Sequence, residues 1–143
     1  MAPRWWRRLQ MRWVNAAPTP AWLVMRDRDG EPYWYEWRDD DIPTLVVVHK
    51  GSTVGRANIV WNEKYCELAD IVIQNPARRR CGLGAAMMRE IVAHARAKGM
   101  QAIVGTIKPG DGGEPREYLR EWYGRQGFQF KGNRLFMNLQ PGK

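Results

Sequence analysis

A strand-like apolar run, a turn rich in arginine and glycine, and a helical pattern follow one another along the middle of this chain. Tyr65–Ile73 has the length and apolar content of a buried strand, and Gly82–Lys98 spaces its apolar residues three and four apart. A second short strand, Gln101–Thr106, follows. Because two strands joined by a helical crossover lie parallel in one sheet, this stretch predicts a parallel strand pair with a helix packed across it.

Antiparallel strands are expected upstream of this unit. Three apolar runs, Thr44–His49, Val54–Trp61 and Tyr65–Ile73, are separated by short polar turns and predict an antiparallel meander. Before them, Ala21–Arg26 and Tyr33–Arg38 flank an Asp-Arg-Asp-Gly turn and predict a hairpin, with a helical turn in the second run as the alternative. Most strand pairs are therefore expected to be antiparallel.

The last third of the chain adds a second helix and another hairpin. Pro115 suits a first helical position and predicts a helix to about Arg125, which Gly127 ends. Phe128–Lys131 and Arg134–Leu139 flank a Gly-Asn turn and predict a closing hairpin. The whole pattern predicts an α/β (α+β) fold with a mixed, mostly antiparallel central sheet.

The bulk properties favour a single domain over residues 1–143. The chain is 44% hydrophobic and 27% charged, which is ordinary for a globular protein, and its net charge is +8. No segment approaches the ~20 apolar residues that a membrane span needs, and the arginine-rich start lacks the apolar core of a signal peptide. We therefore expect a cytoplasmic protein that makes no membrane contact. The basic charge favours a polyanionic partner, either a phosphorylated cofactor or a nucleic acid.

Cysteine and histidine are sparse. Cys66 and Cys81 form no metal-like spacing, and His49 and His94 stand far apart in the sequence. We therefore expect no metal site. A disulfide is not expected in a reducing compartment, so Cys66 is interpreted as a small buried residue. His94 is interpreted as a surface histidine or as one whose hydrogen bonds are satisfied.

The N-terminal part, residues 1–43, is rich in tryptophan and arginine. Leu9, Met11 and Trp13 alternate with polar neighbours and suggest a first strand. The same region interleaves cations with aromatic rings in a way that can bind nucleic acid, at Arg4, Trp5, Trp6, Arg7, Arg8, Arg12 and Trp13. The alternatives are an amphipathic packing segment or a homodimer interface.

The Arg/Gly turn before the first helix is the strongest chemical signal. A turn that opens a helix offers backbone N–H groups without intrahelical partners, together with the positive end of the helix dipole. Gly82 and Gly84 let a bulky anion approach the main chain, and the neighbouring arginines add charge. These residues predict a phosphate site, in particular one for a diphosphate.

Two motifs give this chain a resemblance to a known family. Residues 79–84 read Arg-Arg-Cys-Gly-Leu-Gly, with Pro76 three residues before them, and residues 123–128 read Tyr-Gly-Arg-Gln-Gly-Phe. The first fits the cofactor motif Gln/Arg-x-x-Gly-x-Gly/Ala, and the second fits Tyr-x-x-x-Gly-Phe at the end of the last helix. With the predicted element order, the chain resembles the Gcn5-related N-acetyltransferase (GNAT) family over roughly residues 44–139.

This resemblance implies acetyl-CoA as the donor, without a metal, and an amine as the acceptor. Direct attack of the amine in a ternary complex is the implied mechanism. It also implies helices on both faces of the central sheet and a parallel strand pair that splays apart at the cofactor site. The implied donor-binding residues are Ile71, Val72 and Ile73 of the strand, Arg79, Arg80, Cys81, Gly82, Leu83, Gly84 and Ala85 around the turn, and Arg116.

Two side chains are candidates for the chemistry. The resemblance implies that Tyr123 protonates the departing thiolate, whereas the alternative is an aromatic core residue. Glu67 and Asp70 are candidate general bases, and strict alternation places them on opposite faces, with Glu67 beside Ile71 and Asp70 beside Val72. We prefer Glu67; a surface ion pair, or a water chain without a dedicated base, is the alternative.

The sequence also departs from the family pattern. Arg116 and Leu119 stand where many members have asparagine and alanine, so Arg116 is expected to reach a phosphate instead. The N-terminal part is short of the helix pair that commonly forms the acceptor site. The acceptor therefore stays open: a small molecule, a protein amine, or an amine attached to a tRNA or a nucleic-acid-binding protein. A nucleic-acid-associated protein without transferase activity is the competing function.

Overall fold

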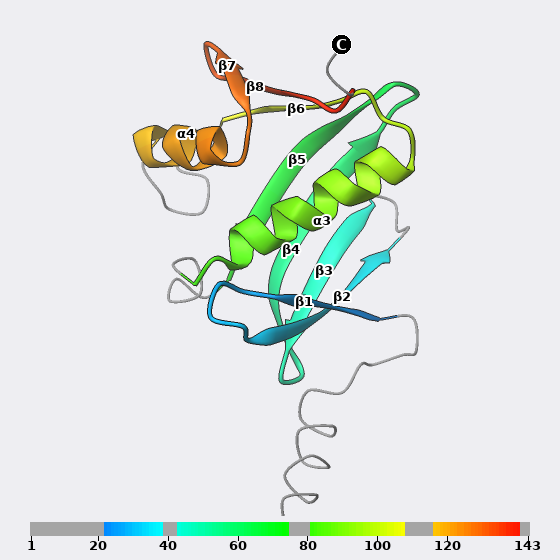
Figure 1. Ribbon diagram of the computed structural model, residues 1–143, viewed down its shortest axis with the longest axis vertical. Helices are drawn as coiled ribbons and strands as arrows, with labels where there is room; N and C mark the ends of the chain where they lie inside the picture. Colours follow the sequence, from blue (N-terminus) through cyan, green and yellow to red (C-terminus); the bar gives the residue numbers. More distant parts are fainter. Residues whose placement is uncertain (1–21, 39–42, 75–80, 108–115, 141–143) are drawn as a thin grey trace, which may run out of the picture.

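The computed structural model describes residues 22–38, 43–74, 81–107 and 116–140, which form one eight-stranded sheet with two helices. The strands follow the order β1-β2-β3-β4-β5-β6-β8-β7. Figure 1 shows helix α3 lying diagonally across one face of this sheet and α4 near the edge that β7 and β8 form. In these four stretches, no helix has the length and apolar content needed to cross a membrane.

The first five strands form a continuous antiparallel meander, in which the predicted hairpin precedes the predicted three-stranded meander. They are β1 (Leu23–Arg26), β2 (Pro32–Arg38), β3 (Thr44–His49), β4 (Ser52–Trp61) and β5 (Tyr65–Ile73). The hairpin around the Asp-Arg-Asp-Gly turn is confirmed, and the helical alternative for the second run is wrong. The strand suggested over residues 9–13 lies outside the described residues.

The β3–β4 connection is tighter than the sequence indicated. Lys50 and Gly51 both have positive φ, 49° and 80°, and form a two-residue turn that pairs His49 with Ser52. Such a turn matches the twist of the strands that it joins. Strand β4 therefore begins two residues before the predicted Val54.

Helix α3 (Leu83–Ala97) and strand β6 (Ala102–Thr106) complete the predicted crossover. The helix buries one apolar side in the core, through Leu83, Ala86, Met87, Met88, Ile91 and Ala95. Strand β6 pairs in parallel with β5, as predicted. Tyr35 ties the meander to the helix, because its hydroxyl donates a 2.8 Å hydrogen bond to the Glu90 carboxylate.

Helix α4 (Arg116–Arg125) leads into β7 (Gln129–Lys131) and β8 (Arg134–Asn138), which form the predicted closing hairpin. Strand β8 inserts between β6 and β7. Helices α3 and α4 share the main apolar core and contact each other, so both lie on the same face.

A smaller apolar cluster occupies the opposite face. Trp22, Val46 and Val48 are buried there, and Trp34 packs against them. Val46 and Val48 flank Val47, which belongs to the main core, and successive strand residues point to opposite faces. In the described part of the chain, the expected helical cover is found on the main-core face alone.

Candidate active site

Strands β5 and β6 separate in the middle of the sheet. Their parallel pairing ends at Leu68 and Gly105, whereas β5 continues beside β4 as far as Ile73. Beyond Leu68, the edge of β5 that faces β6 has no strand partner among the described residues. Where a neighbouring strand parts in this way, the strand edge can pair with an extended ligand.

A β-bulge lies at the point of separation. Asn58 pairs with Asp70 and Ile59 pairs with Leu68, so Ala69 is an extra residue on β5. A bulge bends its strand and is frequent next to active sites. No sequence pattern predicts this bulge, because a bulge depends on how two strands pair and not on the pattern of one strand.

The predicted anion site lies at the start of α3. Gly82 is the N-cap, with φ 82° and ψ 14°, and no side chain caps the helix. The first intrahelical bond runs from the Ala86 N–H to the Gly82 carbonyl at 3.1 Å, so the N–H groups of Leu83, Gly84 and Ala85 have no partner within the helix. Leu83 is fully buried and anchors the turn, whereas Gly82 and Ala85 are partly exposed.

The end of β5, the start of α3 and helix α4 meet at Gly84. A Cβ built on Gly84 would lie 2.9 Å from Cζ2 of Trp122 and 3.3 Å from Cδ1 of Ile73. Only glycine lets the three segments approach this closely. The structure thus brings together two predicted donor-binding residues, Ile73 and Gly84, and places the residue before Tyr123 against them.

Tyr123 lies just after this contact in α4. Its ring is 9% exposed and packs edge-to-face with Trp122 at 4.9 Å and with Phe128 at 5.6 Å between ring centroids. These contacts fix the position of the phenol, as its predicted role in acid catalysis requires. They equally suit a core aromatic residue, so the catalytic role stays a prediction.

The carboxylate argument from the sequence is wrong in its geometry. Because of the bulge, Ile71 pairs with buried Ala57 and packs toward the core, while Asp70 pairs with Asn58 on the other face. Glu67 pairs with Val60, which is 41% exposed, and so lies on the same face as Asp70. Glu67 is therefore not beside Ile71, and both carboxylates are on the face opposite the helices.

The β1–β2 turn contacts the residues that begin α3. The Arg28 N–H donates a 2.9 Å hydrogen bond to the Cys81 carbonyl, and a Cβ built on Gly82 would lie 3.0 Å from the Cβ of Arg28. The sequence marked these residues only as a hairpin turn. Their contact with the helix start joins segments more than fifty residues apart, so no local pattern could have predicted it.

Several predicted residues are beyond the described part. Arg79 and Arg80, together with Pro76, lie outside the described residues, as does the Trp/Arg-rich segment. Arg116 begins α4, but its side chain is not described. Val72 is half-buried and pairs with Arg56 on the face of the carboxylates.

The cysteines differ in their surroundings. Cys66 is fully buried, as expected, and burial raises the pKa of its thiol to about 11. Cys81 is partly exposed, forms no disulfide and lies at the predicted anion site. Its sulfur lies within 4.8 Å of carboxylate oxygens of Asp27 and Asp29. Asp27 already accepts hydrogen bonds from the Asp29 N–H (2.9 Å), the Glu31 N–H (3.0 Å) and the Tyr33 hydroxyl (2.9 Å), so we interpret this group as turn structure.

Both histidines are packed against other groups. His49 is 6% exposed, and its Nε2 lies 2.8 Å from a carboxylate oxygen of Glu31. His94 stacks on Trp37 at 4.2 Å between ring centroids and meets the edge of Trp61 at 5.4 Å. Neither lies at the start of α3, so neither enters the candidate site.

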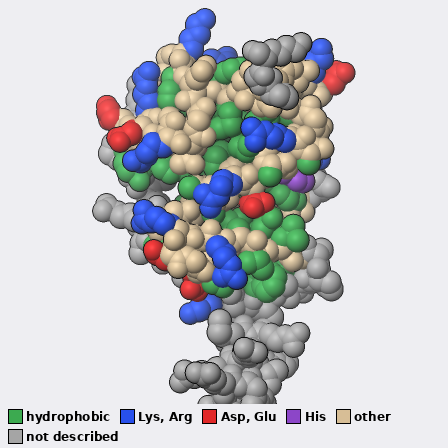
Figure 2. Space-filling view, viewed as in Figure 1, with side chains coloured by type: hydrophobic (Ala, Val, Ile, Leu, Met, Phe, Trp, Pro, Cys, Tyr) green, Lys and Arg blue, Asp and Glu red, His purple; other side chains and the backbone are tan. Residues whose placement is uncertain are grey.

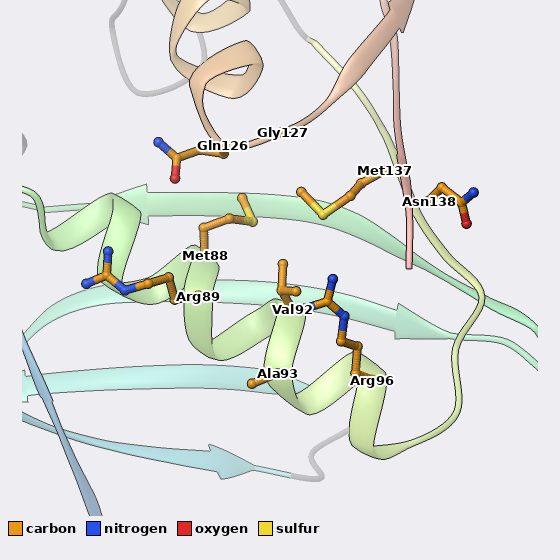
Figure 3. Close-up of a pocket in the computed structure, with 9 residues that line it drawn as sticks. All are labelled: Met88, Arg89, Val92, Ala93, Arg96, Gln126, Gly127, Met137 and Asn138. Atoms are coloured by element: carbon orange, nitrogen blue, oxygen red, sulfur yellow. The ribbon is translucent and has the colours of Figure 1, made fainter. Parts of the chain in front are cut away.

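A separate hollow lies farther along α3. Its volume is about 460 Å³, and α3, the end of α4 and strand β8 surround it (Figure 3). None of the predicted donor-binding or catalytic residues is among the described residues that line it. The hollow and the helix start are thus two different features of the same face.

The sequence and the fold were compared with those of known proteins, and both match members of one family. The profile of the acetyltransferase (GNAT) family matches residues 8–128. The GNAT domain of S. lividans PAT is 13% identical, with a TM-score of 0.66 over 85% of this chain and 99% of that one. A GNAT family acetyltransferase from Elizabethkingia anophelis with acetyl-CoA bound is 14% identical, with a TM-score of 0.52 over 68% and 76% of the two chains.

A third solved structure, the PaiA N-acetyltransferase of Thermoplasma acidophilum in complex with coenzyme A, is 13% identical, with a TM-score of 0.56 over 66% of this chain and 59% of that one. No curated protein sequence matches the chain. At these identities the solved structures show a shared fold. The family profile covers well over half of the sequence, including the turn before α3 and the end of α4. This chain belongs to the acetyltransferase (GNAT) family.

Proposed function

We propose that this protein transfers the acetyl group of acetyl-CoA to a primary amine by direct attack in a ternary complex. The observation that carries the proposal is the meeting point at Gly84, where the uncapped start of α3, the end of β5 and the Trp122–Tyr123 pair of α4 come together. The solved GNAT structures that hold acetyl-CoA or coenzyme A support the choice of donor. The proposal treats the chain as a single cytoplasmic domain that works without a metal.

The donor diphosphate binds at the start of α3 in this proposal. Three N–H groups without helical partners and the positive end of the helix dipole face an anion there. Arg79 and Arg80 are assigned to the same phosphates, and Arg116 takes the place of the asparagine that is frequent in the family. We add Arg28, because its backbone is bonded to the turn itself and its side chain is exposed.

The pantetheine arm lies along β5 where β6 has parted from it, from the bulge toward Ile73. Its amides pair with main-chain groups of β5 beyond Leu68, as a neighbouring strand would. A main-chain N–H near Ile71–Ile73 then donates to the thioester carbonyl oxygen and stabilises the oxyanion. Holding donor and amine in line supplies a further part of the rate enhancement.

The chemical step forms one bond and breaks another. The neutral amine nitrogen attacks the thioester carbon, and the C–S bond breaks as the tetrahedral intermediate collapses. Tyr123 donates a proton to the departing thiolate, and the ammonium proton of the acceptor leaves to a base or to water. Glu67 is our first candidate for that base. Asp70 is an equal candidate in position, because it lies on the same face and just beyond the last residue that pairs with β6.

Calorimetry with acetyl-CoA, followed by an amine screen that detects free thiol, tests the proposal. We expect saturable binding to the wild type and thiol release that depends on an amine. Tyr123→Phe should bind the donor normally and lose about 10- to 100-fold in kcat, and a matched Tyr118→Phe variant on the exposed side of α4 should lose nothing. Absence of binding at millimolar donor would overturn the proposal.

Two further variants separate the base candidates. Glu67→Gln and Asp70→Asn each remove one carboxylate from the same face without changing its size. The pH profile of kcat/KM should lose its acidic limb in the variant that lacks the base. If both variants keep the limb, proton transfer to water replaces a dedicated base.

A further inference from the structure

The hollow beside α3 has an apolar floor. Met88 and Met137 are 2% and 8% exposed, and Figure 3 shows their side chains facing each other across the hollow. Val92 lies between the two arginines that rise from α3. Thioether side chains adapt to the shape of a bound group, so this floor suits an apolar body, including an aromatic ring. The volume of about 460 Å³ is within the range of small-molecule sites.

The rim of the hollow is cationic. Arg89 and Arg96 stand seven residues apart on α3 and project on either side of Val92 (Figure 3). No salt bridge joins either guanidinium to a described carboxylate, and the described residues around the hollow include no Asp or Glu. Figure 2 shows further lysine and arginine side chains spread over this face. An anion therefore meets attraction here without displacing an ion pair.

The hollow lies beside the donor site and faces another way. It extends along α3 from Met88 to Arg96, about 6 to 18 Å along the helix axis from Gly84, and it opens between α3 and the end of α4, whereas the donor turn faces the end of β5. We propose that the hollow is a second binding site, which takes a small organic anion with an aromatic or similarly apolar body and one carboxylate, sulfonate or phosphate group. Arg89 and Arg96 hold the anionic group, and Met88, Val92 and Met137 contact the body.

Methyl NMR of methionine-labelled protein tests this directly, with 2-naphthoate as the probe and neutral 2-naphthamide as its control. The resonances of Met88 and Met137 are assigned by methionine-to-leucine variants. We expect naphthoate to shift these two resonances saturably and to bind about fivefold more tightly than naphthamide, because two exposed charge contacts contribute modestly. Equal binding of the two probes, or no saturable shift at Met88 and Met137, would overturn the proposal.

Charge-removing variants and the donor complete the test. Arg89→Gln combined with Arg96→Gln should abolish the preference for naphthoate, while Arg125→Gln, which removes one nearby surface charge, should preserve it. Arg89 and Arg96 are both exposed, so the melting temperature of the double variant should stay unchanged. Saturating acetyl-CoA should leave naphthoate bound. Displacement of the probe by acetyl-CoA would assign the hollow to the nucleotide end of the donor and refute a second site.

Discussion

Replacing Gly84 with alanine tests whether the meeting of α3, α4 and β5 is as tight as the structure shows. The added Cβ would lie 2.9 Å from Cζ2 of Trp122 and 3.3 Å from Cδ1 of Ile73. The nearer atom belongs to a rigid indole ring, so the ring or the helix must move. Overpacking of this kind costs about 1–3 kcal/mol, and alanine regains about 0.5–1 kcal/mol over glycine inside a helix. We expect a net loss of about 0.5–2 kcal/mol in the free energy of unfolding.

A double-mutant cycle with Trp122→Phe isolates the contact. Phenylalanine lacks the outer ring that carries Cζ2, so Gly84→Ala should cost nothing, or even stabilise, when Trp122 is already phenylalanine. The coupling free energy should be about 1–2 kcal/mol in favour of the double variant. Urea unfolding followed by far-UV circular dichroism measures all four proteins, with equal m-values as the check that unfolding stays two-state. A coupling below about 0.5 kcal/mol would refute the contact as the reason for glycine here.

Three further predictions follow from the contacts described above. Burial, and then the Glu90 carboxylate that accepts its hydrogen bond, raise the pKa of Tyr35 from 10.0 to about 12. The stabilisation that the neutral phenol provides is therefore complete below pH 10 and is lost as pH rises toward 12. Tyr35→Phe should flatten the fall in unfolding free energy over that range, and an unchanged slope would contradict the assignment. In native protein a maleimide should label Cys81 but not buried Cys66, whose pKa is about 11. Bound acetyl-CoA should slow the labelling of Cys81, and equal labelling rates with and without acetyl-CoA would place the donor elsewhere. Arg28→Gln should weaken acetyl-CoA binding about 3- to 10-fold by calorimetry while Arg125→Gln leaves it unchanged, and equal effects would mean that only overall charge matters.

The sequence predicted those parts of the fold that depend on local pattern. The strand runs from Thr44 to Ile73 and the apolar side of α3 appear where periodicity placed them, with ends shifted by one or two residues. The start of α3 also follows from the local sequence, because Gly82 takes a positive φ that other residues rarely adopt. These features need only the neighbours in the chain.

Pairing and long-range contact decide the rest. The bulge at Ala69 exists only in the register between β4 and β5, and the Arg28 bond to Cys81 joins the first hairpin to a turn far along the chain. The close approach of Trp122 to Gly84 is likewise a property of two helices together. None of these three features produces a hydrophobic periodicity or a motif in the sequence, so the sequence did not predict them.

One extra residue in β5 has a chemical consequence for the proposed reaction. Without Ala69 in its bulge, strict alternation would put Asp70 on the helix face, beside the donor; with it, Asp70 and Glu67 share the opposite face. A base on that face can accept a proton only from an amine that approaches from there. The donor is expected on the face of α3 and α4, so the two substrates would meet where β5 and β6 part. A bulky acceptor then never has to pass the helices, and the face that lacks a described helical cover is the face on which we expect acceptor specificity to reside.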